Sequence, residues 1–186
     1  MYALSSRKLI ALSLMVLCCS SLWSQDAGKD EKRRVYDAQR LFSIIPPAGW
    51  DKVAQTTGKN MILARTADAT EVFSNFNVQR ISSKENFPSL RELAQAIAAQ
   101  QKANTPSFVV EGEEDLKVDG RASYVLFSSQ ERLIAGANMR IHAASYMIPT
   151  KGNVMYIVTF SMPASAHQKV KPRVLESVKT IKIVTK

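Results

Sequence analysis

The amino-acid sequence predicts an α+β fold, in which an antiparallel β-sheet is flanked by helices. Three features of the chain lead to this prediction: many segments have the composition of strands, short turns join consecutive strands, and two amphipathic helices stand apart from them. The chain has 186 residues, of which 46% are hydrophobic and 22% are charged. This size and composition favour one globular domain and exclude a wholly disordered chain.

The predicted strands are segments rich in β-branched and aromatic residues that lie between glycines. They cover residues 41–45, 60–65, 71–81, 108–111, 115–118, 121–128, 138–148 and 154–162. Alternation is clearest in the last segment, where Tyr156, Val158 and Phe160 are expected on one face. The Asp119-Gly120 pair predicts a tight hairpin, and residues 149–153 predict a longer one. Such short connections indicate antiparallel pairing.

The first predicted helix follows a capping box, with Ser89 at the N-cap and Glu92 three residues later. An apolar stripe at helical spacing comes next, and Pro106 ends the segment. The stripe consists of Leu90, Leu93, Ala94, Ile97 and Ala98. These features predict a helix that packs on one face of the sheet.

The second predicted helix lies within residues 164–177. Val170, Val174 and Val178 recur every four residues and are expected on its buried face. Because proline is favoured in the first turn of a helix, Pro172 predicts that the helix proper starts there. Residues 180–184 are expected to form a final strand or an extended end.

The first 24 residues have the pattern of a secretory signal peptide. Arg7 and Lys8 precede an uncharged apolar run over residues 9–17, and small residues follow it. We expect cleavage after Ser24, which makes residues 1–24 the signal peptide, 25–40 a flexible lead-in and 41–186 a single domain. The protein is then exported and is periplasmic or secreted.

A lipoprotein signal is the alternative interpretation of the same segment. Cys19 would then become the lipidated first residue, and the protein would be lipid-anchored in the envelope. The residues before Cys19 fit that pattern poorly, so cleavage near Ser24 is preferred. Both cysteines, Cys18 and Cys19, lie in this segment. A chain cut after Ser24 therefore has no disulfide and no thiol nucleophile.

The sequence contains no recognised catalytic motif, phosphate-binding loop or dinucleotide fingerprint. His142 and His167 lie far apart along the chain, without Cys or His neighbours at metal-ligand spacing. We expect His142 to be hydrogen-bonded or at the surface and His167 to be solvated. The acidic stretch 111–115 is expected to be a solvated hairpin rim rather than a cation site. We therefore predict no catalytic residue, cofactor or metal, and a protein that is not an enzyme.

The chain is basic, with a formal net charge of +9 at pH 7. Its C-terminal segment concentrates positive charge, and the valine stripe should turn Lys169, Lys171 and Arg173 outward. We expect these three residues to bind an anionic membrane surface or an acidic protein weakly, with a solvated helix face as the alternative. Reversing their charges should leave thermal stability nearly unchanged. Nucleic acid is not expected, because no nucleic-acid-binding motif accompanies the charge.

Several short motifs follow one another in an order that resembles the PsbP-like superfamily, which includes photosystem PsbP proteins, DcrB-type periplasmic lipoproteins and Mog-type Ran-binding proteins. The motifs are Leu41-Phe42-Ser43-Ile44-Ile45-Pro46-Pro47-Ala48-Gly49-Trp50, Phe76-Asn77-Val78, Ser89-Leu90-Arg91-Glu92-Leu93, Val118-Asp119-Gly120-Arg121-Ala122, Tyr156-Ile157-Val158-Thr159-Phe160 and Leu175-Glu176-Ser177-Val178-Lys179. In the last motif, Val178 stands where the family usually has an aromatic residue. The resemblance covers roughly residues 41–184 and implies an exported bacterial protein with an antiparallel sheet flanked by helices.

The resemblance also bears on function. Known members of this superfamily mostly bind partners, and they share no catalytic residues that could be transferred to this chain. We therefore expect an exported, non-enzymatic binding or assembly module of the cell envelope. The alternative is a small-molecule or lipid carrier with a pocket between sheet and helices. In either case the motif that ends at Trp50 should place the indole ring against the sheet.

Overall fold

The computed structural model describes residues 31–53, 62–66, 71 and 73–184. The chain divides into two units, Met1–Arg34 and Val35–Lys186, which are considered separately. In the described part of the first unit, the Arg34 guanidinium binds the Glu31 carboxylate at 2.7 Å. The predicted signal peptide, its cleavage after Ser24 and the alternative lipidation at Cys19 lie outside the described residues.

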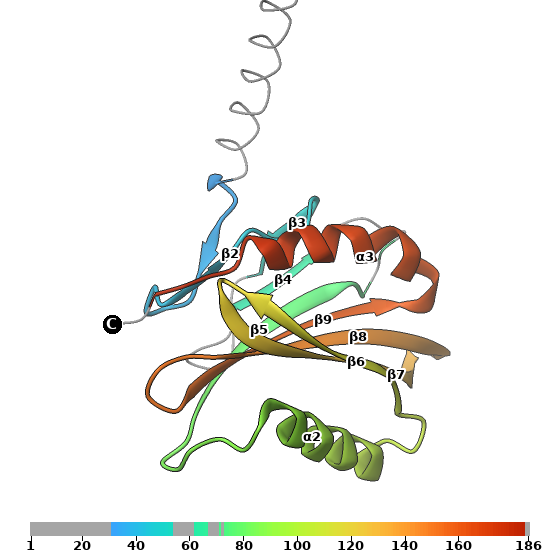
Figure 1. Cartoon of the computed structure of the whole chain (residues 1–186). Helices are drawn as coiled ribbons and strands as arrows, with labels where there is room; N and C mark the ends of the chain where they lie inside the picture. The colour runs from blue at the N-terminus through green and yellow to red at the C-terminus, as the bar shows by residue number, and fades with distance from the viewer. Residues whose placement is uncertain (1–30, 54–61, 67–70, 72, 185–186) are drawn as a thin grey trace, which may run out of the picture. The chain divides into compact units, whose positions relative to one another are not determined.

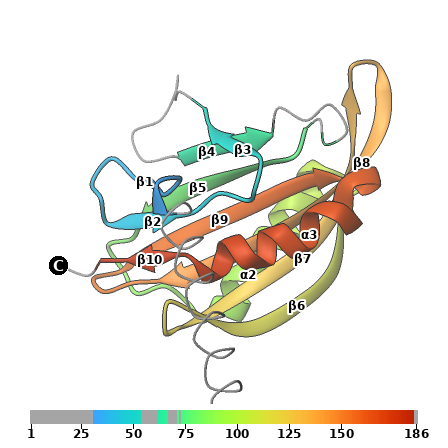
Figure 2. The same cartoon turned by 90° about the horizontal axis from the view of Figure 1, so that it is seen from above.

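The second unit is an antiparallel sheet with one helix on each face (Figure 1). Its described strands pair in the order β3-β4-β5-β9-β8-β7-β6, which Figure 2 shows from above. Their bounds along this order are Trp50–Lys52, Ile62–Thr66, Asn75–Ser82, Val154–Pro163, Ala137–Pro149, Arg121–Ile134 and Val109–Val118. The α+β prediction is confirmed.

A smaller sheet contains β1 (Val35–Tyr36), β2 (Phe42–Ile44) and β10 (Lys182–Ile183), in the order β1-β2-β10. The prediction that residues 25–40 form a flexible lead-in was wrong for residues 35–40, because β1 pairs with β2. The side chain of Asp37 explains why this segment is structured. Its buried carboxylate accepts hydrogen bonds from the Leu41 amide at 2.7 Å, from the Phe42 amide and from the Tyr156 hydroxyl at 3.2 Å.

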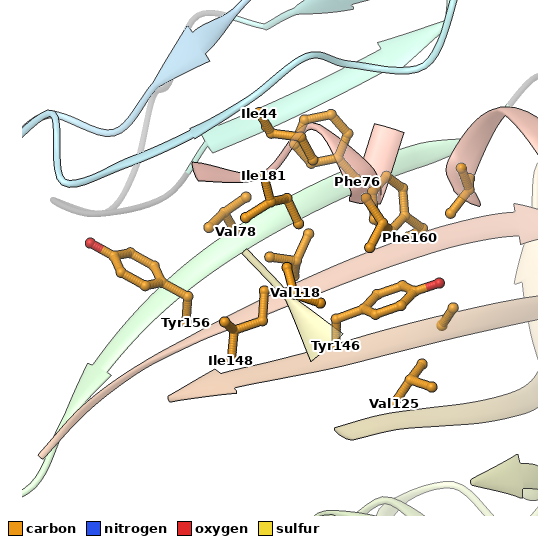
Figure 3. Close-up of a cluster of buried hydrophobic side chains, with 14 of the residues drawn as sticks. Ile44, Phe76, Val78, Val118, Val125, Tyr146, Ile148, Tyr156, Phe160 and Ile181 are labelled. Atoms are coloured by element: carbon orange, nitrogen blue, oxygen red, sulfur yellow. The ribbon is translucent and has the colours of Figure 1, made fainter. Parts of the chain in front are cut away.

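Helix α3 (Ala164–Lys179) covers the main hydrophobic core on one face of the sheet. Val170, Val174 and Val178 are buried as predicted, and they pack with Phe76 and Phe160 in a cluster of which Figure 3 shows several members. The prediction that the helix starts at Pro172 was wrong. The helix begins two turns earlier, because Ala166 and Val170 are also buried against the sheet, and this burial outweighs the backbone hydrogen bond that proline cannot donate.

Helix α2 (Leu90–Asn104) packs on the opposite face of the sheet. The predicted capping box is present: the Glu92 amide donates to Ser89 Oγ at 3.2 Å, and the Ser89 amide donates to Glu92 Oε2 at 2.9 Å. The predicted apolar stripe contacts a second, smaller hydrophobic cluster. That cluster contains Tyr124, Leu126, Met147 and Met155.

The hairpins follow the predicted turns, with Asp119 at φ 50° and Gly120 at φ 74°, the left-handed pair that a two-residue hairpin requires. Several boundaries differ. The strand expected at 71–81 begins at Asn75, and the strand expected at 121–128 continues to Ile134. The strands expected at 108–111 and 115–118 form one strand, β6, which passes through the acidic stretch with a bulge between Val110 and Gly112. Glu111 is the extra, unpaired residue of this bulge, and residues 112–118 pair with β7 beyond it, so the acidic residues that follow remain in the sheet.

Trp50 lies in the core as predicted. Its side chain is 1% exposed, and its ring centroid lies 6.3 Å from that of Phe76 and 6.5 Å from that of Phe160. The turn before it contains Gly49 at φ 81°, a conformation that favours glycine. The Trp50 amide donates to the Pro47 carbonyl at 3.0 Å, which closes that turn over the sheet.

Candidate functional site: a polar groove beneath helix α2

The sheet face that carries α2 is apolar only in part. Beside the second cluster, neighbouring strands align rows of neutral polar side chains across the sheet. Asn77 pairs with Thr159, and Thr159 pairs with Ser145. In the next row, Asn75 pairs with Ser161, and Ser161 pairs with Ala143, which pairs with Ser128. Because side chains alternate between faces along a strand, these residues lie back to back with the aromatic core.

These rows form the floor of a groove with a volume of about 1100 Å³, which we call the polar groove. Its floor is formed by Asn75, Asn77, Ser128, Ser145, Thr159 and Ser161, and α2 contributes Ile97, Gln100 and Gln101 along one side. The charged residues of the lining are Asp51, Lys52, Arg65 and Arg132, which come from β3, β4 and the distal part of β7. The central strands β5, β8 and β9 contribute no charge to it.

The floor residues are half-buried, except Ser128, which is buried, and they are rich in groups that donate and accept hydrogen bonds. Ser145 Oγ and Thr159 Oγ1 lie 3.1 Å apart and hydrogen-bond to each other. Among the described residues, we find no hydrogen bond to the side chains of Asn77 and Ser161. The groove can therefore recognise a ligand by side-chain hydrogen bonds without having to neutralise a charged floor.

Phe73 lies in the lining of the polar groove and is held in an unfavourable backbone conformation. Its φ is 73°, which is strained for a bulky residue, and its side chain is 43% exposed. The Asn75 side-chain amide donates to the Phe73 carbonyl at 2.9 Å, and the Ser74 amide donates to the Glu71 carbonyl at 2.8 Å. An exposed aromatic side chain held in a strained conformation is typical of a binding site.

Glu71 anchors this segment from the other side of the sheet. Its carboxylate is fully buried and binds Arg173 and Lys169 of α3, the latter at 2.9 Å. Burial works against ionisation, but the hydrogen bonds and charges of Lys169 and Arg173 outweigh it and hold the pKa of Glu71 below its usual value. The ion pairs therefore fix the chain two residues before Phe73.

This arrangement corrects part of the prediction made for the basic face of α3. Lys169, Lys171 and Arg173 were expected to project outward together, but Arg173 is directed to Glu71 and also donates to the Ala48 carbonyl at 2.9 Å. Lys169 reaches the same carboxylate from an exposed position. Lys171 is exposed and forms no ion pair within the described part of the chain. The physical reason is Glu71, a buried acid whose position next to α3 the sequence does not reveal.

The two histidines, distant in sequence, lie together between β8 and α3. Their rings are parallel with centroids 4.5 Å apart, and His142 Nδ1 lies 2.8 Å from Glu111 Oε2. The hydrogen-bonded state expected for His142 is confirmed, whereas His167 is half-buried rather than fully solvated. Burial and the proximity of His142 and Lys171 hold the pKa of His167 below its usual value.

The cavity at this histidine pair has a volume of about 30 Å³, which is enough for one water molecule. It has no room for an organic substrate. The acidic stretch joins the same region: Glu111 contacts His142, and Glu113 accepts a hydrogen bond from the Tyr124 hydroxyl at 2.6 Å. The acidic side chains of the stretch are exposed, as expected, but they lie along the edge strand β6 rather than at the rim of a hairpin.

Within the described residues, no three His, Cys, Asp or Glu side chains are grouped in a way that could hold a metal ion. In the same part of the chain, no helix is both long enough and apolar enough to cross a bilayer.

No protein-family model matches this chain, and no curated protein matches it either. Its fold is similar to that of several solved structures. Cyanobacterial PsbP (CyanoP) from Synechocystis sp. PCC 6803 aligns with a TM-score of 0.58 at 14% identity, over 81% of this chain and 91% of that protein. The Ran-binding protein Mog1p from Saccharomyces cerevisiae aligns with a TM-score of 0.58 at 10% identity, over 81% of this chain and 94% of that protein.

A third similar structure is LpqN from Mycobacterium tuberculosis, a protein described as involved in cell envelope biogenesis. It aligns with a TM-score of 0.51 at 13% identity, over 77% of this chain and 83% of that protein. The chain therefore has the PsbP-like fold, as its motifs predicted. At these identities the similarity establishes the architecture, and the function has to be argued from the site.

Proposed function

We propose that the protein is a non-enzymatic binding module of the cell envelope and that the polar groove is its binding site. The observation that carries this proposal is the set of aligned, half-buried polar side chains on the α2 face of the sheet. A sheet face left open beside a covering helix exposes hydrogen-bonding groups that neither the helix nor the core uses. Concave sites with a few convergent polar groups are the usual location of ligand binding.

The composition of the groove favours binding over catalysis. Its lining contains Asp51 as the one carboxylate and no histidine or cysteine within the described residues. General acid–base catalysis needs a titratable pair near the reacting atoms, and nucleophilic catalysis needs an activated nucleophile beside a base. The serines of the floor lie without such a base, so we assign them to recognition.

A small-molecule or lipid carrier is the second candidate, because a volume of about 1100 Å³ between sheet and helix is large enough for a small ligand. The chemistry of the floor argues against a lipid. Acyl chains gain affinity from apolar walls, whereas Asn77, Ser145 and Thr159 would lose hydrogen bonds to water without replacement. A carrier role is therefore limited to polar ligands.

Export is proposed from the N-terminal pattern of residues 1–24. Fractionation of cells, followed by intact-mass measurement of the purified protein, tests this part separately. We expect an envelope or secreted fraction and a mature chain that starts near Gln25. A diacylglyceryl mass on Cys19 would move the protein to a lipid-anchored state, and an intact chain in the cytosol would contradict export.

A capture experiment tests the proposed site. The protein is used as bait in envelope extract in three forms: wild type, Ser161→Arg and Leu175→Arg. The first variant places a long side chain in the polar groove, and the second alters an exposed residue on α3 as a matched control. We expect Ser161→Arg to lose the captured component and Leu175→Arg to keep it. Equal capture by both variants would contradict the proposal.

A further inference from the structure

We propose that the polar groove binds an uncharged oligosaccharide. This inference rests on the proposed function, since it names the class of ligand for the same site. It follows from three properties of the groove: a floor of neutral donors and acceptors, an apolar margin beside that floor, and an exposed aromatic ring held by a strained backbone.

The floor can recognise hydroxyl groups. The Asn77 amide offers donors and an acceptor in one plane, and Ser145 and Thr159, which bond to each other, each keep capacity for a further hydrogen bond. A sugar presents adjacent hydroxyls that also donate and accept, so one residue can bond several floor groups. The part of a ligand that lies on the floor would find no counter-charge, because β5, β8 and β9 contribute none, and the charged lining residues Asp51, Lys52, Arg65 and Arg132 come from other strands.

The backbone amides and carbonyls of the floor strands already form hydrogen bonds within the sheet. Strands β5, β9, β8 and β7 lie inside the sheet with a neighbour on each side, so their amides and carbonyls bond to one another. A peptide that binds by strand addition needs a free strand edge, which this floor does not offer. Recognition here must come from side chains, which favours a hydroxyl-rich ligand over a peptide.

The apolar margin of the groove can contact the C–H groups on the face of a sugar ring. Ile97 of α2, together with Leu126 and Ile157 of the sheet, places apolar groups beside the polar floor. A pyranose ring has hydroxyls at its edge and C–H groups on its faces, so it can satisfy both parts of this surface. Phe73, which is 43% exposed, supplies an aromatic face of the kind on which C–H groups stack.

The conformation of Phe73 is the feature that packing alone leaves unexplained. A φ of 73° costs free energy for residues other than Gly, Asn and Asp. The Asn75 amide and the Glu71 segment hold Phe73 in this conformation from both sides. A ligand-stacking role accounts for an aromatic residue at a position where Asn or Gly would make the fold more stable.

Phe73→Asn separates the two roles, because Asn tolerates the left-handed conformation but removes the ring. The full-length protein is assayed on an array of uncharged oligosaccharides built from hexoses and N-acetylhexosamines, with oligogalacturonates as anionic controls. Asn77→Ala is the second variant, and Leu175→Ala on α3 is the matched control. Thermal unfolding is measured for each protein.

We expect wild type and Leu175→Ala to bind one or more uncharged oligosaccharides. Phe73→Asn and Asn77→Ala should each bind them about tenfold more weakly, as expected for the loss of one good contact. The thermal midpoint of Phe73→Asn should be unchanged or higher. If Phe73→Asn fails to fold, the comparison between Asn77→Ala and Leu175→Ala decides whether the oligosaccharide binds in the polar groove.

Three outcomes would overturn the inference: no binding to any uncharged member of the array, binding to oligogalacturonates alone, or binding that survives in both groove variants. Loss of partner capture by Ser161→Arg, combined with no oligosaccharide binding, would overturn this inference and leave the proposed function in place. The two claims are therefore tested separately.

Discussion

Arg173 on α3 binds Glu71, a fully buried carboxylate that precedes β5, and it also holds the Ala48 carbonyl in the turn before Trp50. One side chain thus connects the helix to both segments that flank β3 and β4. The Glu71 segment leads directly into Phe73. The ion pair at the α3 face of the sheet therefore supports the polar groove on the α2 face. Two of the three cations predicted to meet a partner therefore bind a residue of this chain.

The first prediction concerns this ion pair. Arg173→Glu should lower the free energy of unfolding by about 3–5 kcal/mol, because it leaves a buried carboxylate facing a like charge. Lys171→Glu, on the exposed side of the same helix, should change it by about 0.5 kcal/mol or less. Urea denaturation measures both variants. Equal effects would contradict a structural role of Arg173 and would restore the earlier expectation that all three cations are exposed.

The second prediction concerns the start of the folded unit. Asp37→Ala should lower the free energy of unfolding by about 2–3 kcal/mol, because two buried donors and one half-buried donor lose their acceptor. Those donors are the amides of Leu41 and Phe42 and the hydroxyl of Tyr156. Gln39→Ala, at an exposed position of the same segment, is the control. An unchanged unfolding midpoint for Asp37→Ala would mean that residues 35–40 are a lead-in after all.

The third prediction uses Trp50 as a probe of the core. In a Trp23→Phe variant, Trp50 is the only tryptophan, because the chain has two. Its emission should be blue-shifted in the native state and should move to the red in one cooperative transition during denaturation. The reason is that its ring is 1% exposed beside Phe76 and Phe160. Native emission typical of water-exposed indole would contradict this packing.

The fourth prediction concerns acid. Because the folded-state pKa of His167 lies below its ordinary value of 6.5, the unfolded state binds this proton more tightly. The stabilising contribution of His167 is therefore present above pH 6.5 and is lost as the pH falls below that value. Glu111 and Glu71 have lowered pKa values too, but their contributions are lost only below 4.5. The thermal midpoint should fall between about pH 7.5 and about pH 5.5.

Two variants assign this acid effect to the histidine pair. Around His167 lie His142 on β8, Glu111 on β6 and Lys171 on α3. His167→Gln should reduce the fall of the midpoint, since it removes the group that takes up the proton. Lys171→Gln should also reduce it, since the Lys171 charge depresses the pKa of His167. A fall as steep as that of wild type in both variants would assign the effect to other groups.

The sequence predicted those parts of the fold that depend on local pattern. The Ser89–Glu92 capping box, the valine stripe of α3 and the Asp119-Gly120 hairpin are each encoded within a few residues, and each was correct. The start at Pro172 and the break in β6 were wrong, because tertiary burial and a bulge override local propensity.

The candidate site depends on register, which sequence alone determines poorly. The approach of His142 to His167 and of Arg173 to Glu71 requires knowledge of how α3 lies against β8 and β5. The polar groove did leave one trace in the sequence. In β5 and β9, the residues that alternate with the aromatic core are Asn75, Asn77, Thr159 and Ser161, whereas a solvent-facing row usually carries charges.

Photo-cross-linking in cells tests whether the polar groove is the binding site. A photoreactive amino acid is introduced at Asn77 or Ser161 in the groove, and at Leu175 on α3 as the comparison position. Irradiation should yield one discrete adduct from each groove position and none from Leu175. Adducts from Leu175 alone would contradict the account and would assign binding to the exposed face of α3 around Lys171.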